Sequence, residues 1–353
     1  MGVGKYLEYW GGLPVHWLEA PVDLEAASPE MRNLLTMSPN SRPTTWAEVG
    51  AAAPRADRVA WGLATAYDSD VSYTEVFEGF LQAVDTTRVR SLLLGYWGKG
   101  ILSREPANLP AELLCAHADR FPALRSLFVG HITSDQHEIS WIPRGDVTQV
   151  LESFPELEEL TYRFGQRSNR DEPSDVLRPV RHERLRRLTL ETGGLPAHVP
   201  GAIAACDFPA LEHLDVWLGV EFYGGDATVR DLDALLVGAS LPRLRHLGMM
   251  NSEIQNDIAT ALAAAPIVAR LASLDLSMGT LSDAGVEALL TGQPLTHLQN
   301  LTVEHHFVSE SMARRLRDLL ESAGVEVTMP AAEELYDWLI DEGQEGRYTQ
   351  VSE

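Results

Sequence analysis

The chain has 353 residues, 45% of them hydrophobic, and carries 51 Asp and Glu against 28 Lys and Arg, for a net charge of −23. Proteins bind nucleic acids chiefly through basic patches, which neutralise the phosphates and release their counterions into solvent. This excess of acidic residues repels phosphates and therefore argues against DNA or RNA as a partner. The same repulsion argues against an anionic membrane surface. A basic or neutral protein remains as the favoured class of partner.

The N-terminal residues give no sign of export or membrane insertion. Residues 1–10 contain no apolar stretch like the core of a signal peptide. No run in the sequence approaches the roughly 20 apolar residues of a transmembrane helix. We therefore expect a cytoplasmic protein. We also expect it to be a monomer.

Residues 1–57 are interpreted as a partly irregular lead-in, because prolines interrupt them repeatedly. From residue 58 the pattern becomes regular. Residues 59–66 predict a strand and residues 73–84 predict a helix. Together they indicate a unit that caps the N-terminal end of the repeats that follow.

The template Leu-x-x-Leu-x-Leu, with conservative apolar exchanges, then recurs eight times. Alternate side chains of a short strand point to the same side, so the fourth and sixth positions of each unit are expected to face a common core. No unit can bury this apolar face alone, which is why many units must stack. The first positions, which lie 35, 33, 28, 26, 33, 27 and 27 residues apart, are Val89, Leu124, Leu157, Leu185, Leu211, Leu244, Leu271 and Leu298.

Between these strands the hydrophobic period lengthens to about 3.6 residues, which predicts a covering helix in each interval. The clearest cases are residues 229–237, 258–265 and 286–290. Ser282 and Ser309 stand where two of the helices should begin, and serine is a typical N-cap residue.

Beyond the last template strand, residues 311–320 predict a final helix and residues 325–327 a capping strand. Residues 331–353 form an acidic C-terminal tail, and residues 331–345 within it contain no Lys or Arg. The repeat domain therefore spans residues 58–330 with about eight or nine units. The fold class is α/β: a solenoid of horseshoe form, with parallel strands on the concave face and helices on the convex face.

The units Leu-Glu-His-Leu-Asp-Val from Leu211 and Leu-Ala-Ser-Leu-Asp-Leu from Leu271 resemble leucine-rich repeats of the long, ribonuclease-inhibitor-like kind. More narrowly, the chain resembles a family of bacterial cytoplasmic leucine-rich-repeat proteins of unassigned function. The resemblance implies a leucine-rich-repeat solenoid and lends no activity. It extends over nearly the whole chain from about Leu13 and is carried by Asp85-Thr-Thr-Arg-Val-Arg, Glu138-Ile-Ser-Trp-Ile, Glu191-Thr-Gly-Gly-Leu-Pro and Tyr223-Gly-Gly-Asp-Ala-Thr.

Catalytic motifs are absent from the sequence. It contains no Walker loop, no His-Glu-x-x-His zinc motif, no paired Cys-x-x-Cys, no nucleophile elbow and no dinucleotide-binding fingerprint. We therefore predict a non-catalytic scaffold that binds a protein or peptide, without a cofactor and without a stoichiometric metal ion.

The third, fifth, seventh and eighth positions of each unit leave the core and are expected to line the concave face. Aromatic residues and methionine, which are enriched where proteins bind one another, occur at several of these positions. The alternative is that loops or the acidic tail cover this face. The predicted partner-binding residues are Tyr96, Phe128, His131, Phe164, Glu191, His213, Asp215, Trp217, His246, Met250, Asp275, Glu304 and His305.

One group of these residues suggests chemistry. His213 and His246 occupy the same position in neighbouring units, so their Cβ atoms should lie about 5 Å apart. Asp215 lies two residues along the same strand, and Asp275 lies on a strand further over. Two imidazoles and a carboxylate can hold zinc or transfer protons, which leaves an enzyme or enzyme-associated subunit as the alternative function. Aligned polar residues are also what a solvated concave sheet shows, and that simpler interpretation is favoured.

Overall fold

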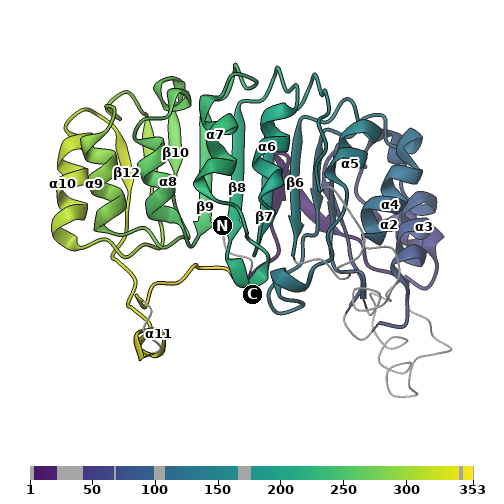
Figure 1. Ribbon diagram of the computed structural model, residues 1–353. Coiled ribbons are helices and arrows are strands. Elements are labelled where there is room, and N and C mark those ends of the chain that lie inside the picture. The colour runs from purple at the N-terminus through teal and green to yellow at the C-terminus, as the bar shows by residue number, and fades with distance from the viewer. Residues whose placement is uncertain are drawn as a thin grey trace. The chain divides into compact units, whose positions relative to one another are not determined.

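The structure of the protein is a computed structural model that describes residues 4–21, 43–66, 69–98, 108–165, 176–341 and 345–352 (Figure 1). The chain forms two compact units, Met1–Gln136 and His137–Glu353. Strands alternate with helices in both units, so the fold class is α/β and is consistent with a leucine-rich-repeat solenoid, as the sequence predicts. Among the described residues, no helix is both long enough and apolar enough to cross a membrane.

The first unit contains a sheet whose strands lie in chain order. β1 pairs antiparallel with β2, and the later pairings are parallel. The strands are β1 (Tyr9–Trp10), β2 (Leu13–Trp17), β3 (Ala60–Leu63), β4 (Ser91–Leu94) and β5 (Ser126–Val129). The helices are α2 (Trp46–Ala52), α3 (Tyr73–Ala83) and α4 (Leu109–Ala116), with 3-10 turns at Thr86–Arg88 and Ala118–Arg120.

The predicted N-terminal cap is present in this unit as β3 and α3. α3 begins in a capping box: Ser72 Oγ accepts from the Glu75 amide at 3.2 Å, and the Ser72 amide donates to the Glu75 carboxylate at 2.7 Å. The predicted lead-in is more regular than expected, since β1, β2 and α2 fall within it. Residues 22–42 of that lead-in lie outside the described residues.

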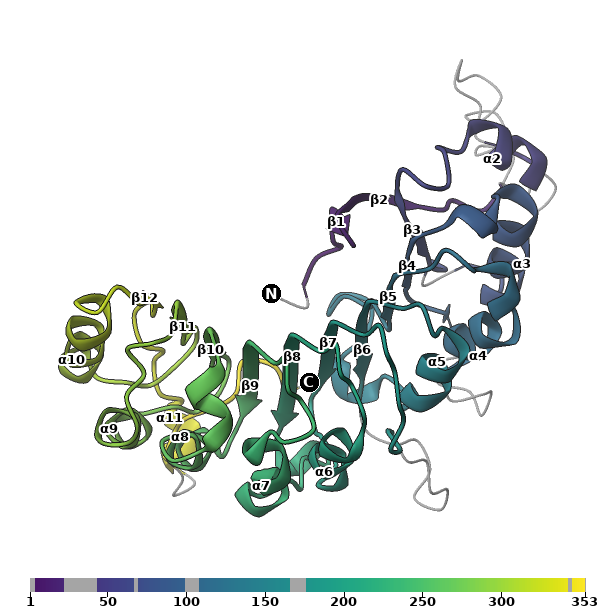
Figure 2. The same ribbon diagram turned by 90° about the horizontal axis from the view of Figure 1, so that it is seen from above.

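The second unit continues the strand–helix alternation, and its helices α6 to α10 lie on one side of the sheet (Figure 2). Its strands are β6 (Glu159–Phe164), β7 (Arg187–Thr192), β8 (His213–Gly219), β9 (His246–Ser252), β10 (Ser273–Asp275), β11 (Asn300–Thr302) and β12 (Glu326–Thr328). Its helices are α5 (Val147–Ser153), α6 (His198–Ala205), α7 (Val229–Val237), α8 (Gln255–Leu262), α9 (Asp283–Thr291), α10 (Glu310–Glu321) and α11 (Asp337–Asp341). 3-10 turns lie at Ile139–Trp141, Glu221–Tyr223 and Pro266–Arg270.

The fourth position of each template unit forms a continuous buried row between sheet and helices. In the second unit each leucine of the row is the direct register partner of the next, and Val327 of the predicted capping strand closes it. The leucines, all 0% exposed, are Leu160, Leu188, Leu214, Leu247, Leu274 and Leu301. The register predicted from the template is therefore confirmed.

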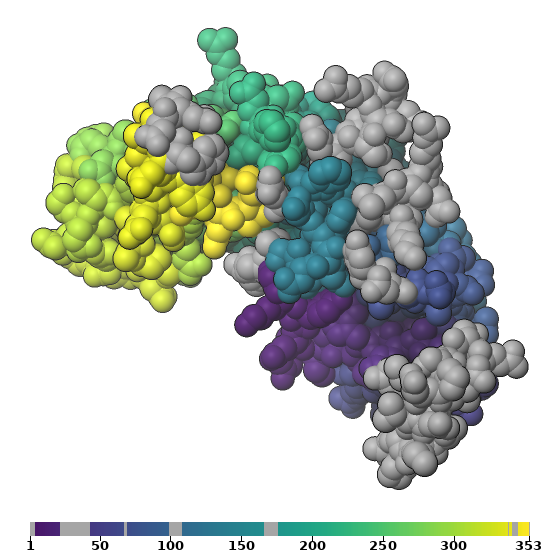
Figure 3. Space-filling model, turned by 90° about the horizontal axis from the view of Figure 1, so that it is seen from below, coloured from purple at the N-terminus to yellow at the C-terminus, as the bar shows by residue number. Residues whose placement is uncertain are grey.

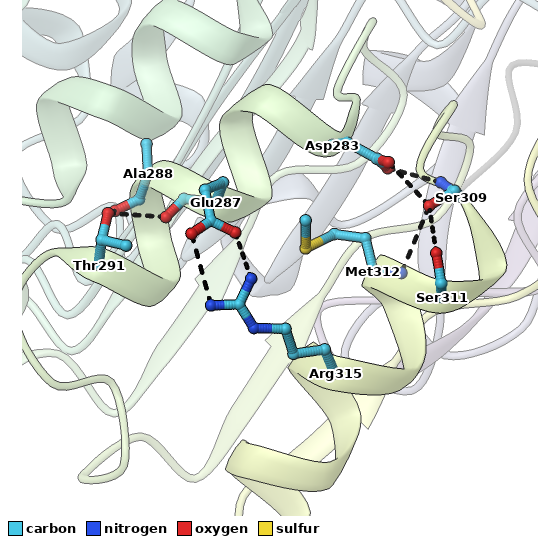
Figure 4. Close-up of polar contacts among 8 residues, drawn as sticks. All are labelled: Asp283, Glu287, Ala288, Thr291, Ser309, Ser311, Met312 and Arg315. Atoms are coloured by element: carbon cyan, nitrogen blue, oxygen red, sulfur yellow. Dashed lines mark hydrogen bonds and ion pairs between the residues drawn. The ribbon is translucent and has the colours of Figure 1, made fainter.

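Neighbouring helices of the second unit contact one another through polar side chains, as α9 and α10 show (Figure 4). Ser309 caps α10 by accepting from the Met312 amide at 3.3 Å, as predicted. Its own amide and hydroxyl donate to Asp283 in the first turn of α9, both at 2.7 Å. Further along the same two helices, Glu287 and Arg315 form an ion pair. Repeats are thus linked through their helices as well as through their strands.

Ser282 behaves differently from the other predicted cap. It occupies the N-cap position of α9, but its hydroxyl makes no capping bond and is hydrogen-bonded to Asn256 of α8. The Asn256 side chain caps the first turn of α9, because its Oδ1 accepts from the amides of Ser282 and Gly285 at 3.0 and 3.1 Å. A residue one repeat earlier therefore does the capping.

Replacing Leu274 with Ala tests the leucine row. Leu274 is 0% exposed and pairs with Leu247 and Leu301 on both sides. We expect Leu274→Ala to lower the free energy of unfolding by about 2–5 kcal/mol, through lost transfer free energy and a residual cavity. Denaturant unfolding measures this, and a variant as stable as the parent would show that the register is not the one described.

Candidate functional site

The inner face of each sheet, defined as the face opposite its helices, carries the residues predicted to bind a partner. In the first unit these residues are buried, and two of them, Phe128 and His131, contact the chain's own N-terminal segment, residues 4–21. Tyr96, Phe128 and His131 are 2%, 3% and 2% exposed. The Trp10 ring lies 5.3 Å from that of Phe128, and the Leu7 amide donates to His131 Nε2 at 3.3 Å. The expected exposure is therefore wrong here, because strands β1 and β2 bring apolar side chains onto this part of the sheet.

In the second unit, the predicted residues near the carboxyl ends of the strands are also buried. Phe164 is 0% exposed, and Trp217 and Met250, which pair across β8 and β9, are 3% and 8% exposed. Glu191 is 6% exposed and forms an ion pair with Arg163 on β6 at 2.6 Å. These side chains were predicted to be exposed, and instead they pack or pair within the unit.

The C-terminal segment, residues 345–352, covers the strand ends of the second unit (Figures 1 and 3). It is hydrogen-bonded to each of three successive repeats. His305 Nε2 donates to the Tyr348 carbonyl at 2.9 Å, and the Gln350 amide donates to the Met278 carbonyl at 2.9 Å. The Val351 amide donates to Asn251 Oδ1 at 3.0 Å, and Asn251 Nδ2 donates back to the Val351 carbonyl. The alternative stated from the sequence, that the tail covers the concave face, therefore holds for this part of it.

The three repeat residues that hold this segment share an unusual backbone. Asn251, Met278 and His305 have φ of 51°, 70° and 57°, in the left-handed region that non-glycine residues seldom adopt. They stand 27 residues apart, each at the eighth position of its template unit. Further along, a Cβ on Gly193 would lie 2.7 Å from the Ser352 carbonyl oxygen, so only glycine leaves room for the segment there.

A polar strip of the inner face in the second unit stays accessible beside this segment. We define the open strip as the third and fifth positions of β8 to β11, most of which are half-buried. Glu304, just beyond it, is exposed. The residues of the open strip are His213, Asp215, His246, Gly248, Ser273, Asp275, Asn300 and Thr302. Of the predicted partner-binding residues, it contains His213, Asp215, His246 and Asp275.

Three of these side chains converge. His213 and His246 are direct register partners on β8 and β9, and their rings stack at 3.9 Å with an interplanar angle of 8°. Both Nε2 atoms approach one carboxylate: His213 Nε2 lies 2.7 Å from Asp215 Oδ2, and His246 Nε2 lies 2.8 Å from Asp215 Oδ1. The other ring nitrogen of His246, Nδ1, lies 2.6 Å from Ser273 Oγ on β10.

The carboxylate of Asp215 is held in its charged form. Burial favours the neutral carboxyl, but the hydrogen bonds and charges of His213 and His246 outweigh it and hold the pKa of Asp215 well below its usual range. Gly248 makes this possible, because a Cβ at that position would lie 2.2 Å from Asp215 Oδ1. The carboxylate therefore lies over β9 only because β9 has no side chain there.

Asp275 stands on the other side of Gly248, in the same register row as Asp215. Burial and the nearby charge of Asp215 raise the pKa of Asp275, opposed by the hydrogen bond from the Ser277 amide at 2.9 Å and by His246. No Lys or Arg among the described residues forms an ion pair with it. The open strip thus holds a carboxylate whose ionised form is opposed by burial and by Asp215, and which forms no ion pair with a Lys or Arg among the described residues.

Sequence reasoning missed Gly248 and Ser273, and it gave Asn251, Met278 and His305 no role in binding the C-terminal segment. Gly248 is the one glycine at the fifth position among the eight template units, which was a readable signal. The regular spacing of Asn251, Met278 and His305 was a second one. Ser273 carried no signal, since a serine at the start of a strand is ordinary and only the approach of His246 gives it a role.

The protein is thus an α/β repeat protein in which the terminal segments of the chain partly cover the inner face of the sheet in each unit. A crystal structure of a protein from Bacteroides fragilis, determined by the Northeast Structural Genomics Consortium, is similar to this chain with a TM-score of 0.71 and 24% sequence identity. The match covers 84% of this chain and 78% of the other. At this identity the likeness concerns the fold alone. A scan against models of protein families finds no match, and neither does a search of curated proteins.

Replacing Trp217 with Ala tests whether this residue belongs to the core. With 3% of its surface exposed, Trp217 should behave as a core side chain. We expect Trp217→Ala to lower the free energy of unfolding by about 3–5 kcal/mol, measured by denaturant unfolding. An unchanged stability combined with weaker partner binding would instead return Trp217 to the binding surface predicted from the sequence.

Replacing Asp275 with Asn tests whether the open strip carries an uncompensated charge. Because the folded chain raises the pKa of Asp275, its ionised form opposes folding above the pKa of the unfolded chain, about 3.9. We expect Asp275→Asn to raise the melting temperature at pH 7 and to lose that advantage as the pH falls below the pKa of the unfolded chain, about 3.9, because the carboxyl then binds its proton in both the folded and the unfolded parent. A variant that melts below the parent at pH 7 would contradict this.

Proposed function

We propose that this protein is a non-catalytic binding module that holds an extended, basic segment of a partner protein on the open strip. The observation that carries the proposal is the row formed by Asp215, Gly248 and Asp275 on three neighbouring strands. Two carboxylates share this row with no side chain between them, and Asp275 has no cationic side chain paired to it among the described residues. A lysine or arginine of a partner would supply the missing charge.

The chemistry of the whole chain supports a basic partner. With a net charge of −23, the protein attracts basic surfaces and repels acidic ones. Complementary charge of this kind speeds association and selects against wrong partners. The aromatic residues predicted from the sequence to anchor a partner are buried, which leaves charge and hydrogen bonding as the means of recognition on the open strip.

The C-terminal segment supplies an example, within the molecule, of the proposed mode of binding. It crosses the ends of β11, β10 and β9 as an extended chain and makes one contact per repeat, through Tyr348, Gln350 and Val351. Repeats at regular spacing offer groups at regular spacing, which suits an extended peptide. The open strip runs alongside this segment and repeats with the same period.

A second candidate function is an enzyme or an enzyme-associated subunit with its site at His213, Asp215 and His246. The convergence of two imidazoles on one carboxylate favours it, because such groups can transfer protons or hold a metal ion. The two candidates differ in what a partner-free sample should do: an enzyme converts a substrate, whereas a binding module converts none.

The binding proposal predicts that charge on the open strip decides partner capture. Immobilised full-length protein is offered a cell extract of its source, and captured proteins are quantified by mass spectrometry. Reversing the charge with Asp275→Lys should weaken capture of the specific partner about 30-fold, the effect of losing a central charged contact of about 2 kcal/mol. The captured segment should be basic, and capture should fall as salt rises.

The matched control is Asp318→Lys, which makes the same change of charge at an exposed position on α10. It should leave capture unchanged. Equal loss in both variants would mean that only net charge matters, and equal capture by parent and Asp275→Lys would mean that the partner binds elsewhere. Either result would overturn the placement of the binding surface.

A further inference from the structure

We propose that His213, Asp215 and His246 form a binding site for one divalent transition-metal ion of the zinc type. This inference goes beyond the proposed function, because it concerns the isolated chain and requires no partner. It also reverses the preference drawn from the sequence, where the spacing of the residues could not show that their ligand atoms meet.

The backbone places the three ligands without any loop. His213 and His246 are register partners on adjacent parallel strands, and Asp215 lies two residues after His213 on the same face of β8. Their ligand atoms lie within 4.8 Å of one another. One ion can bridge such a set after small side-chain rotations, since zinc lies about 2.0–2.2 Å from its nitrogen and oxygen ligands.

The donor set selects the kind of ion. Two imidazole nitrogens and one carboxylate oxygen form the three-ligand set of open zinc sites, in which a water or another molecule takes the fourth position. Imidazole suits zinc, copper, iron and nickel, whereas calcium and magnesium prefer all-oxygen sites. His213 and Asp215 retain 22% and 19% of their side-chain surface exposed, so the remaining position can be reached from solvent.

The surroundings of His246 favour a metal ligand. Its Nδ1 lies 2.6 Å from Ser273 Oγ, and a hydrogen bond to the second ring nitrogen is what orients most metal-binding histidines. When Nδ1 donates its proton to Ser273, the neutral ring presents a lone pair at Nε2. That lone pair can bind a metal ion, which takes the place of the proton that Nε2 shares with Asp215 Oδ1, 2.8 Å away, in the metal-free chain.

Gly248 keeps the site open. The Asp215 carboxylate occupies the space where a side chain of residue 248 would begin, with only 2.2 Å between Oδ1 and an added Cβ. Asp275, across this glycine in the same row, adds negative potential beside the site. A glycine at this one position and acidic residues on both sides of it make the cluster more than a chance alignment.

The test is a metal titration of untagged full-length protein, because a polyhistidine tag would bind the same ions. After treatment with chelator and dialysis, Zn²⁺ is titrated by calorimetry, and Co²⁺ is titrated by its visible d–d absorption, which reports nitrogen and oxygen ligands directly. We expect one high-affinity ion per chain, not displaced by excess Mg²⁺ or Ca²⁺. His213→Ala, His246→Ala and the nearly isosteric Asp215→Asn should each abolish this binding.

Two further variants test the surroundings, and one serves as a control. Ser273→Ala should weaken binding by about 10–100-fold, the usual effect of removing a partner of a ligating histidine. Gly248→Ala should weaken it by displacing the Asp215 carboxylate. His198→Ala, at an exposed histidine at the start of α6, should bind as the parent does. Circular dichroism and melting curves confirm that each variant is folded, and Asp215→Asn keeps the test valid if a histidine variant unfolds.

The outcomes separate the proposal from a metal-free hydrogen-bonded triad. If the parent binds Zn²⁺ and Co²⁺ no more tightly than His213→Ala and His246→Ala do, the three residues form only a hydrogen-bonded cluster and the proposal fails. It also fails if binding is stoichiometric but is lost in His198→Ala. Neither result affects the partner-binding proposal, which is read from capture by Asp275→Lys.

Discussion

The burial of one apolar row between sheet and helices is the constraint on which the rest of this structure depends. Leu214, Leu247 and Leu274 pair directly across three neighbouring strands and are fully buried. Since side chains alternate along a strand, fixing these residues on the core side also fixes their neighbours on the inner face. His213 and His246 stack, and Asp215 and Asp275 share a row, because the leucines beside them are in register.

The inner face is not left to solvent, because in both units the chain covers part of it with its own end. In the first unit, β1 and β2 place Trp10 and Leu13 against the sheet. In the second, the segment around Tyr348 and Val351 is hydrogen-bonded to residues with left-handed backbones, a conformation that costs about 1–2 kcal/mol per residue outside glycine. The hydrogen bonds offset part of that cost, so the repeats and the C-terminal segment fit one another.

Covering the apolar part of the inner face leaves a polar part for function. The open strip combines a strongly ionised carboxylate, Asp215, with one whose ionisation is opposed by its surroundings, Asp275. Asp275 forms no ion pair with a Lys or Arg among the described residues, and an added cation would favour the ionised form of this strip. A metal ion at His213, Asp215 and His246 and a basic side chain near Asp275 would each do so at a different point of the strip.

The amino-acid sequence by itself determined the repeat register, the alternation of strands and helices and the α/β class. These follow from local periods: leucines at fixed positions within each unit, and units at intervals of 26 to 35 residues. It also placed His213 and His246 beside each other, since equivalent positions of parallel repeats must be neighbours. Each of these properties follows from the sequence of one repeat and its nearest neighbours.

Only the tertiary structure decided which inner-face residues stay accessible. Asn251 and Val351 are 100 residues apart, and no local pattern shows that they are hydrogen-bonded or that Trp217 is buried. The convergence of two Nε2 atoms on Asp215 likewise depends on side-chain rotation and on the space above Gly248, and a repeat template specifies neither. Periodicity fixes the position of a side chain on the sheet, whereas contacts between distant segments fix what covers it.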